Sequence, residues 1–275
     1  MTNLSVVIGT FNQKDSLKLV LESFTKQTYK DFEIIVVDSS STDGTEEIVR
    51  TEQCSVPTLQ YIRQENNGKT AARNRGIKEA KGEIILLTDA DMIADSQLVE
   101  EHIKAHKKYN NACFEGTTFN FLKKGSDAVE PYIKQKLRAG QKLKWAYFLS
   151  GNLSIKKETL IKAGMFDEDF KSYGWEDIEL GYRLHKMKIP LYYLPSAKNY
   201  HYHFVTDNDM VKRKYNMGKS AAIFYKKHPN FEIKMFLGMN PLAMGIYRFL
   251  KKYPRFLKLS QYLREEFEYR KGLEA

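Results

Sequence analysis

The chain has few cysteines and no long apolar run. Its 275 residues include only Cys54 and Cys113, which are far apart and lack the close spacing of metal-binding pairs. This excludes a disulfide framework and predicts two reduced packing residues. No apolar stretch approaches the roughly 20 residues of a membrane-spanning helix, and residues 1–3 lead into a strand pattern rather than a secretion signal. We therefore expect a soluble, cytoplasmic protein.

Acidic residues are scarce in the last quarter of the chain. Residues 1–211 carry 29 basic and 29 acidic side chains, whereas residues 212–275 carry 15 basic and 5 acidic ones, so the net charge of +10 comes from the C-terminal segment. Such asymmetry suggests contact with an anionic surface, whether lipid headgroups, nucleic acid or an acidic polymer. A solvated basic face explains the composition equally well.

Strand and helix patterns alternate at short intervals along the chain. Continuous apolar runs predict buried strands, and apolar residues at helical spacing follow most of them. This rhythm predicts an α/β fold with a mostly parallel sheet flanked by helices. The expected strands are 4–10, 32–38, 59–62, 84–87, 112–122, 149–155 and 191–194, and the expected helices are 16–26, from 45 onward, 70–79, 96–110, 176–186 and after 209.

Polar residues follow three of these strands at the point where each strand ends. They are Thr10, Asp38 and Asp89, and parallel sheets bind ligands beyond the carboxyl ends of their strands. Asp89 and Asp91 flank Ala90, so two carboxylates could offer hard oxygen ligands to Mg²⁺ or Mn²⁺ and leave positions open for phosphates. Taken alone, such a triplet is more often a pair of solvated loop acids or a helix cap.

Four segments in this order resemble the nucleotide-sugar glycosyltransferases of family 2, which have the Rossmann-like GT-A fold. They are residues 6–12, 35–45, 67–76 and 88–91, and the resemblance extends over about residues 4–205. It implies a catalytic domain at 1–210, with a nucleotide-binding part at about 1–95 and an acceptor-side part at about 96–210. A basic amphipathic helical tail would follow at 211–275.

The resemblance also implies which residues bind the donor. Asp38 would accept a hydrogen bond from the uracil N3 proton, and the planar fork of Arg73 would close over the base or diphosphate. A turn-forming role for Asp38 and a surface ion pair for Arg73 are the alternatives. Ser39 and Ser40 stand where the family often has a second acid and a glycine. The nucleotide-sugar set is Thr10, Asn12, Asp38, Asn67, Arg73, Asp89 and Ala90.

A second set resembles the acceptor side of the family. Residues 150–155 include Gly151 and Asn152, which would contact the acceptor or the sugar. Residues 173–180 resemble the acidic motif of galactosyl- and N-acetylgalactosaminyltransferases, which makes Asp177 the catalytic base. Glu176 would then position a substrate, and Trp175 would stack on a sugar ring. The alternative is an acidic first turn that complements a helix dipole beside a core tryptophan.

Two histidines are candidates to complete the metal site beside Asp91. His201 and His203 lie two apart on an expected strand and would face the same side. GT-A enzymes frequently use a C-terminal histidine in this way, and imidazole suits Mn²⁺. A single histidine is more often a core residue, and the sequence leaves open which of the two binds.

The residues together predict an inverting, metal-dependent glycosyltransferase that uses Mn²⁺ or Mg²⁺. It would move a hexose or N-acetylhexosamine from a UDP-sugar to a hydroxyl of a glycan, lipid-linked or peptide acceptor, in cell-envelope or extracellular glycan synthesis. Residues 123–144 would form a mobile connection over the site. One alternative is a sugar nucleotidylyltransferase, which would have a glycine-rich, arginine-containing loop after the first strand. It is disfavoured because residues 9–14, which include the end of that strand and the loop after it, contain one glycine and no arginine. The other alternative is a non-catalytic module that binds a nucleotide sugar or a polyanion.

The tail mixes apolar and basic residues in a way that suits several partners. An interfacial helix on the anionic inner face of the cell membrane would make the enzyme peripheral. A helical cap on the catalytic domain or a homodimer contact fits nearly as well. Nucleic acid is not an expected partner, because no reading motif accompanies the charge.

Overall fold

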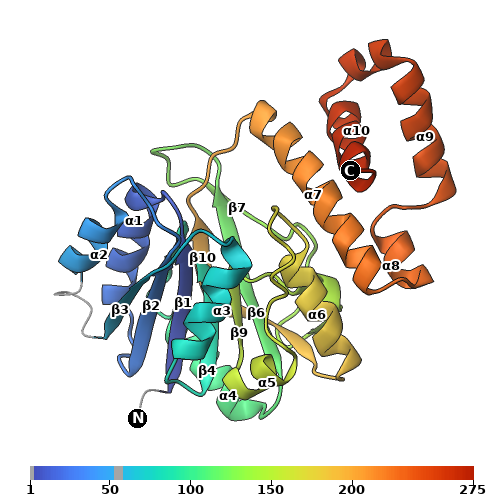
Figure 1. Ribbon diagram of the computed structural model, residues 1–275. Coiled ribbons are helices and arrows are strands. Elements are labelled where there is room, and N and C mark those ends of the chain that lie inside the picture. Colours follow the sequence, from blue (N-terminus) through green and yellow to red (C-terminus); the bar gives the residue numbers. More distant parts are fainter. Residues whose placement is uncertain (1–2, 53–57) are drawn as a thin grey trace. The chain divides into compact units, whose positions relative to one another are not determined.

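The α/β sheet that the sequence predicts is confirmed by the computed structural model, which describes residues 3–52 and 58–275 (Figure 1). Cys54 lies outside the described residues. In the described part, ten strands form one sheet whose main path runs β3-β2-β1-β4-β9-β6-β10-β5. The first elements are β1 (Leu4–Thr10), α1 (Lys14–Thr25), β2 (Phe32–Asp38), α2 (Thr45–Glu52), β3 (Leu59–Arg63), α3 (Lys69–Glu79) and β4 (Ile84–Asp89).

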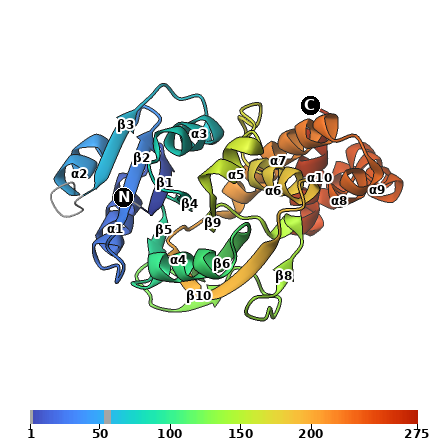
Figure 2. The same ribbon diagram turned by 90° about the horizontal axis from the view of Figure 1, so that it is seen from below.

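Strands β1 to β4 are parallel to one another, and both faces of this part of the sheet are covered. Leu4, Val6 and Ile8 point into one core with α1, whereas Val7 points into the other core with α3. Figure 2 shows α1 and α2 on one side of these strands and α3 on the other. Double burial explains why the strands read as continuous apolar runs rather than as alternating ones.

The rest of the sheet contains antiparallel strands. Its remaining elements are β5 (Met92–Ala94), α4 (Leu98–Lys108), β6 (Cys113–Phe121), β7 (Val129–Pro131), β8 (Lys142–Leu143), β9 (Asn152–Lys156), α5 (Lys157–Lys162), α6 (Glu176–Lys186) and β10 (Leu191–His201). β9 pairs antiparallel with both β4 and β6. Cys113 is a free, buried thiol, and burial raises its pKa, in agreement with a reduced packing residue.

Several details differ from the sequence prediction, among them the short helix α5, which was not expected. β5 was not expected, and the segment 123–144 contains the short strands β7 and β8 rather than only a connection. β10 continues to His201 instead of ending at Leu194. Pro195 and Ser196 interrupt its apolar pattern, and the pairing with β6 shifts register between Leu194 and Lys198. His203 lies beyond the end of β10 rather than on it.

The chain divides into two compact units. The first consists of residues 1–167 and 180–204, and the second consists of residues 168–179 and 205–275, so the boundary falls inside α6. The helices of the second unit are α7 (Asp207–Lys227), α8 (Phe231–Phe236), α9 (Pro241–Lys252), the short 3-10 helix η2 (Pro254–Leu259) and α10 (Gln261–Leu273).

Glycines allow the two long helices of the second unit to pack closely. A Cβ atom added to Gly218 of α7 would lie 1.9 Å from the carbonyl oxygen of Tyr269, and one added to Gly272 of α10 would lie 2.1 Å from that of Tyr215. Any larger residue at either position would push α7 and α10 apart. None of the helices in the described ranges has the length and apolar content needed to cross a membrane.

Candidate active site

The three strand-end residues lie on adjacent strands, as predicted. Thr10 pairs in register with Asp38, and Gly9 pairs with Asp89, so these carboxyl ends meet at one edge of the sheet. Thr10 is buried and its hydroxyl oxygen has no hydrogen-bond partner within the described chain. A buried hydroxyl without a partner is costly. The hydroxyl of Thr10 is therefore available to a polar ligand at this edge of the sheet.

Asp91 lies between two histidines just beyond this edge. Its Oδ2 is 3.4 Å from Nε2 of His201 and 3.3 Å from Nδ1 of His203. The antiparallel pairing of β10 with β5 places His201 opposite Met92. The backbone N–H of Tyr202 also donates to the carbonyl oxygen of Asp91 at 2.7 Å, which holds the end of β10 beside Asp91. The two imidazole rings stack with their centroids 5.3 Å apart.

The donor set at this position fits a divalent cation. One ligand atom each from Asp91, His201 and His203 lies within 4.8 Å of the others. Oδ1 of Asp91 is buried and has no hydrogen-bond partner in the described chain. Nδ1 of His201 lies 3.2 Å from the amide oxygen of Asn120, a contact that favours a proton on Nδ1 and leaves Nε2 as a ligand. One carboxylate and two imidazoles suit Mn²⁺.

The charge state of Asp91 also suits a metal ligand. Burial alone would raise its pKa, but the adjacent imidazoles of His201 and His203 outweigh burial and hold the pKa of Asp91 well below its usual range. The carboxylate is therefore ionised at neutral pH. The side chain of Ala90, between the two acids, is fully buried.

Asp89 binds cationic side chains instead of histidines. Its Oδ1 accepts from Nη2 of Arg73 at 2.7 Å, and its Oδ2 accepts from Nζ of Lys69 at 3.0 Å. Burial would raise the pKa of Asp89, but the charges of Lys69 and Arg73 lower it. Arg73 is itself buried, with its guanidinium 5.1 Å from the ring centroid of Phe166. The two aspartates of the triplet thus have different environments, one cationic and one histidine-lined.

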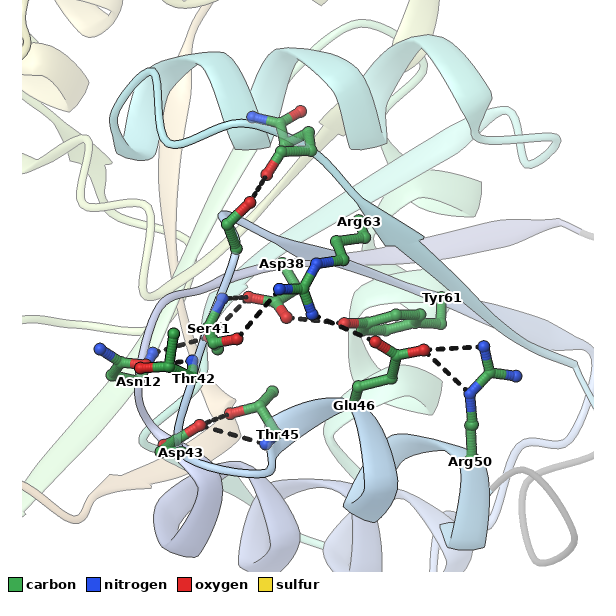
Figure 3. A network of polar contacts seen from close by, with 12 residues as sticks. Asn12, Asp38, Ser41, Thr42, Asp43, Thr45, Glu46, Arg50, Tyr61 and Arg63 are labelled. Atoms are coloured by element: carbon green, nitrogen blue, oxygen red, sulfur yellow. Dashed lines mark hydrogen bonds and ion pairs between the residues drawn. The ribbon is translucent and has the colours of Figure 1, made fainter.

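Asp38 is held in a network of polar contacts (Figure 3). The backbone N–H and the hydroxyl of Ser41 donate to its Oδ1 at 3.0 and 2.6 Å, and the hydroxyl of Tyr61 donates to its Oδ2 at 2.6 Å. The side chain is fully buried. Beside it, Arg63 forms an ion pair with Glu46 at 3.1 Å. Contact between Asp38 and a base would require Tyr61 or Ser41 to share the carboxylate.

Asn12 connects the loops that follow β1 and β2. Its amide oxygen accepts from the backbone N–H of Thr42 at 2.8 Å, and its own N–H donates to the hydroxyl of Ser41 at 2.8 Å. Asn12 has a positive φ of 51°, a conformation that asparagine tolerates better than most residues. Asn67 is exposed in the loop before α3. Contacts of Asn12 and Asn67 with the nucleotide-sugar donor remain predictions.

Gly151 and Asn152 lie at the start of β9. The carbonyl oxygen of Gly151 accepts from Thr88 at 3.1 Å and from Asn199 at 2.7 Å. The side chain of Asn152 is buried, and its amide nitrogen donates to the carbonyl oxygens of Thr117 and Ala197. In the structure Asn152 therefore links β6 to β10, and its predicted contact with a substrate remains a prediction.

Trp175, Glu176 and Asp177 belong to the second unit. Trp175 has a positive φ of 73°, and its indole N–H donates to the carbonyl oxygen of Met217 at 2.9 Å. Its ring packs edge-on against Phe236. Glu176 and Asp177 begin α6, where Glu176 is buried and Asp177 is half-buried. The convergence of these residues with Asp91 on one site is a prediction.

The sequence analysis missed two residues of the first unit. Lys69 lies within the segment 67–76, four residues before Arg73, and residues at this spacing share a helix face. That spacing could have placed Lys69 beside Arg73 in the predicted site. Tyr61 reaches Asp38 only because β3 lies beside β2 in the sheet, and no pattern within the sequence predicts this lateral order.

Comparisons with known proteins agree with the geometry. The model of the family described as glycosyl transferase family 2 matches residues 5–162, and that described as the N-terminal domain of galactosyltransferase matches residues 135–207. The first match covers more than half of the chain. The chain therefore belongs to glycosyl transferase family 2, and it has the GT-A fold that the sequence predicts.

Two curated relatives show the range of this similarity. The chain is 28% identical to a chondroitin synthase of Escherichia coli over 72% of its own length and 34% of the relative's. It is 30% identical to a validoxylamine A glucosyltransferase of Streptomyces hygroscopicus over 68% of its length and 52% of the relative's. The chain thus spans about half or less of the length of these two relatives.

Solved structures share the fold over nearly the whole chain. The mannosyltransferase PcManGT from Pyrobaculum calidifontis, in complex with GDP-Man and Mn²⁺, has a TM-score of 0.65 at 18% identity, covering 99% of this chain and 85% of its own. S. aureus TarS in complex with UDP has a TM-score of 0.60 at 19% identity, with coverages of 99% and 90%.

Proposed function

We propose that this glycosyltransferase moves a hexose or N-acetylhexosamine from a UDP-sugar to a hydroxyl acceptor, with inversion at the anomeric carbon. The observation that carries the proposal is Asp91, an ionised carboxylate with one buried, unpartnered oxygen, placed between two histidines at the carboxyl edge of the sheet. Asp91, His201 and His203 would hold Mn²⁺ or Mg²⁺. Such a cation, when bound, neutralises charge on the leaving diphosphate.

The residues next to Asp91 would bind and orient the donor. Lys69 and Arg73 already form ion pairs with Asp89, and both are donors suited to phosphate oxygens. Thr10 would offer its unpartnered hydroxyl, and Asp38 would read the base. The choice of uridine as the nucleoside of the donor is supported by the complexes of S. aureus TarS with UDP and with UDP-GlcNAc.

The base for the acceptor hydroxyl would be Asp177. An attacking hydroxyl must lose its proton, and a carboxylate within hydrogen-bond reach can accept it. Glu176 would orient a substrate beside it, and Trp175 would offer a flat surface to a sugar ring. The match of residues 135–207 to a galactosyltransferase family supports this assignment and favours galactose or N-acetylgalactosamine. A glycan acceptor in polysaccharide synthesis agrees with the chondroitin synthase relative.

The substitution Asp177→Asn tests the assignment of the base. It keeps the shape of the side chain but removes its basicity, so turnover should fall by about 10² to 10⁴-fold while the Kd for UDP stays unchanged. Single-turnover transfer and calorimetric titration of UDP measure the two quantities.

Asp207→Asn is the matched control for this experiment. Asp207 also lies in the first turn of a helix of the second unit, and it is exposed. Both substitutions therefore remove a charge that complements a helix dipole, a loss of about 0.3–1 kcal/mol. Transfer by Asp177→Asn at the rate of Asp207→Asn would show that Asp177 serves only the helix.

A further inference from the structure

The most unusual surface of the second unit is an apolar stripe along α9. Leu242, Ile246 and Phe249 recur at helical spacing and therefore lie on one face of the helix, and Tyr253 is the C-cap residue that follows at the same spacing. Leu242 is 76% exposed, Ile246 50% and Phe249 49%. The adjoining face of α9 packs into its own unit through the buried side chains of Tyr247 and Leu250. We call Leu242, Ile246, Phe249 and Tyr253 the α9 stripe.

Aromatic residues extend the α9 stripe at its C-terminal end. The ring of Phe249 lies 5.1 Å from that of Tyr253 and 5.4 Å from that of Phe256 in η2. Three neighbouring aromatic rings at the surface form a patch rather than isolated exposed residues, and contiguous exposed patches mark interaction sites. Aromatic rings with one polar end favour the boundary between water and lipid.

Basic side chains border the α9 stripe. Lys252 lies over the ring of Tyr253 at 5.4 Å, and the guanidinium of Arg255 lies over the ring of Phe256 at 5.2 Å. Arg248 is exposed on the same helix. Lys251 is paired with Glu274, whereas within the described ranges Arg248, Lys252 and Arg255 form no ion pair. Positive charge beside apolar rings is therefore available to a partner.

We propose that the α9 stripe and its basic border form a docking surface for an anionic membrane. Apolar side chains would enter the boundary between headgroups and acyl chains while Arg248, Lys252 and Arg255 contact lipid phosphates. A second copy of the chain is disfavoured, because a self-complementary contact would bring these like charges together. The surface would bind the protein peripherally, since α9 lacks the length and apolar content to span a bilayer.

The proposal predicts a specific pattern of vesicle binding by the full chain. The protein should co-sediment with phosphatidylcholine vesicles that contain phosphatidylglycerol, bind vesicles of phosphatidylcholine alone much more weakly, and lose binding as NaCl rises. The double substitution Ile246→Ser/Phe249→Ser should weaken binding on the order of tenfold or more, because it removes apolar groups that enter the bilayer.

Matched variants separate the stripe from general surface effects. Phe231→Ser removes an exposed phenyl ring on α8 outside the stripe and should leave vesicle binding unchanged. Arg248→Glu/Lys252→Glu should weaken binding by at least about fivefold, whereas Lys18→Glu/Lys26→Glu, which reverses one charge on α1 and one at its C-cap, should not. All of these side chains are exposed, so the variants should melt at the temperature of the unmodified protein.

Three results would overturn the proposal. They are equal binding by the stripe variant and the unmodified protein, equal binding to vesicles with and without anionic lipid, and a dimer that Ile246→Ser/Phe249→Ser dissociates without any vesicle binding. The last result would assign the stripe to a second copy of the chain. Sugar transfer to a water-soluble acceptor does not require the α9 stripe. A protein that fails to transfer sugar to such an acceptor would therefore count against the proposed function and not against membrane docking.

Discussion

At the scale of single residues, the two acids of the Asp-Ala-Asp triplet have different partners. Asp89 is neutralised by Lys69 and Arg73, whereas Asp91 faces two imidazoles and keeps one buried oxygen without a partner. The sequence predicted that both acids follow the strand and that His201 and His203 lie beside Asp91, whereas metal binding by these residues remains a prediction. It could not predict that Asp38 would be fully buried and bonded to Tyr61, because that contact depends on which strands are neighbours.

Tyr61 is expected to position Asp38 for the base. Tyr61→Phe removes the donor to Oδ2 of Asp38 and leaves a buried carboxylate oxygen unsatisfied, which should lower the free energy of unfolding by about 1–3 kcal/mol. If the uracil N3–H contacts this oxygen, saturating UDP should recover part of the loss. Urea denaturation with and without UDP measures the difference.

Tyr29→Phe is the control for this substitution. The hydroxyl of Tyr29 accepts an exposed hydrogen bond from Asn3, so removal of this hydroxyl should cost little stability with or without UDP. An equal loss of stability for Tyr61→Phe in both conditions would contradict a role of Asp38 in reading the base.

At the scale of elements, α4 is joined to β9 by a buried chain of hydrogen bonds. Nε2 of His102 lies 2.9 Å from the amide oxygen of Asn152, Nδ1 of His102 lies 2.8 Å from the hydroxyl of Ser154, and Nε2 of His106 lies 2.9 Å from the same hydroxyl. The amide nitrogen of Asn152 is a donor elsewhere, so His102 must donate from Nε2 and accept at Nδ1. This arrangement holds when His102 is neutral, because a proton on its Nδ1 would remove the acceptor for the hydroxyl of Ser154.

This buried chain predicts that the protein loses stability in mild acid. Burial lowers the pKa of His102 to about 4 and that of His106 to about 3, against about 6.5 in an unfolded chain. The unfolded state therefore binds protons first as pH falls below 6.5. Each histidine should cost about 2 kcal/mol of unfolding free energy between pH 7 and pH 5.

The substitution His106→Leu isolates one half of this effect. It removes one titrating ring and keeps the bond between His102 and Ser154, so the loss of stability between pH 7 and pH 5 should shrink by about 2 kcal/mol. Urea denaturation at the two pH values provides the comparison. An identical pH dependence in the variant and the unmodified protein would show that the pKa of His106 is the same in the native and unfolded states.

At the scale of the whole molecule, the sequence predicted the alternating strands and helices because both faces of β1, β2 and β4 are buried. It missed β5, β7 and β8, which have only two or three residues each and therefore no readable period. Nor did any composition shift reveal that residues 168–179 belong with the C-terminal helices. That association depends on contacts between segments distant in the sequence.

The family assignment predicts a preference among donors for the whole molecule. A ligand that binds the native state at about 100 times its Kd adds about 2.7 kcal/mol of stability, so a panel of nucleotide sugars can be ranked by melting temperature. UDP-galactose and UDP-N-acetylgalactosamine with Mn²⁺ should raise the melting temperature most. A larger rise with GDP-mannose would contradict the assignment of Asp38 to uracil.

The most direct test of the account is the binding of Mn²⁺ measured by electron paramagnetic resonance in the presence of UDP. The unmodified protein should bind one ion per chain, with spin-echo modulation from imidazole nitrogen, and Asp91→Asn should bind none. Asp31→Asn, which removes an exposed carboxylate before β2 at the opposite edge of the sheet, should bind normally. Equal uptake of Mn²⁺ by Asp91→Asn and the unmodified protein would contradict a metal-diphosphate site at Asp91.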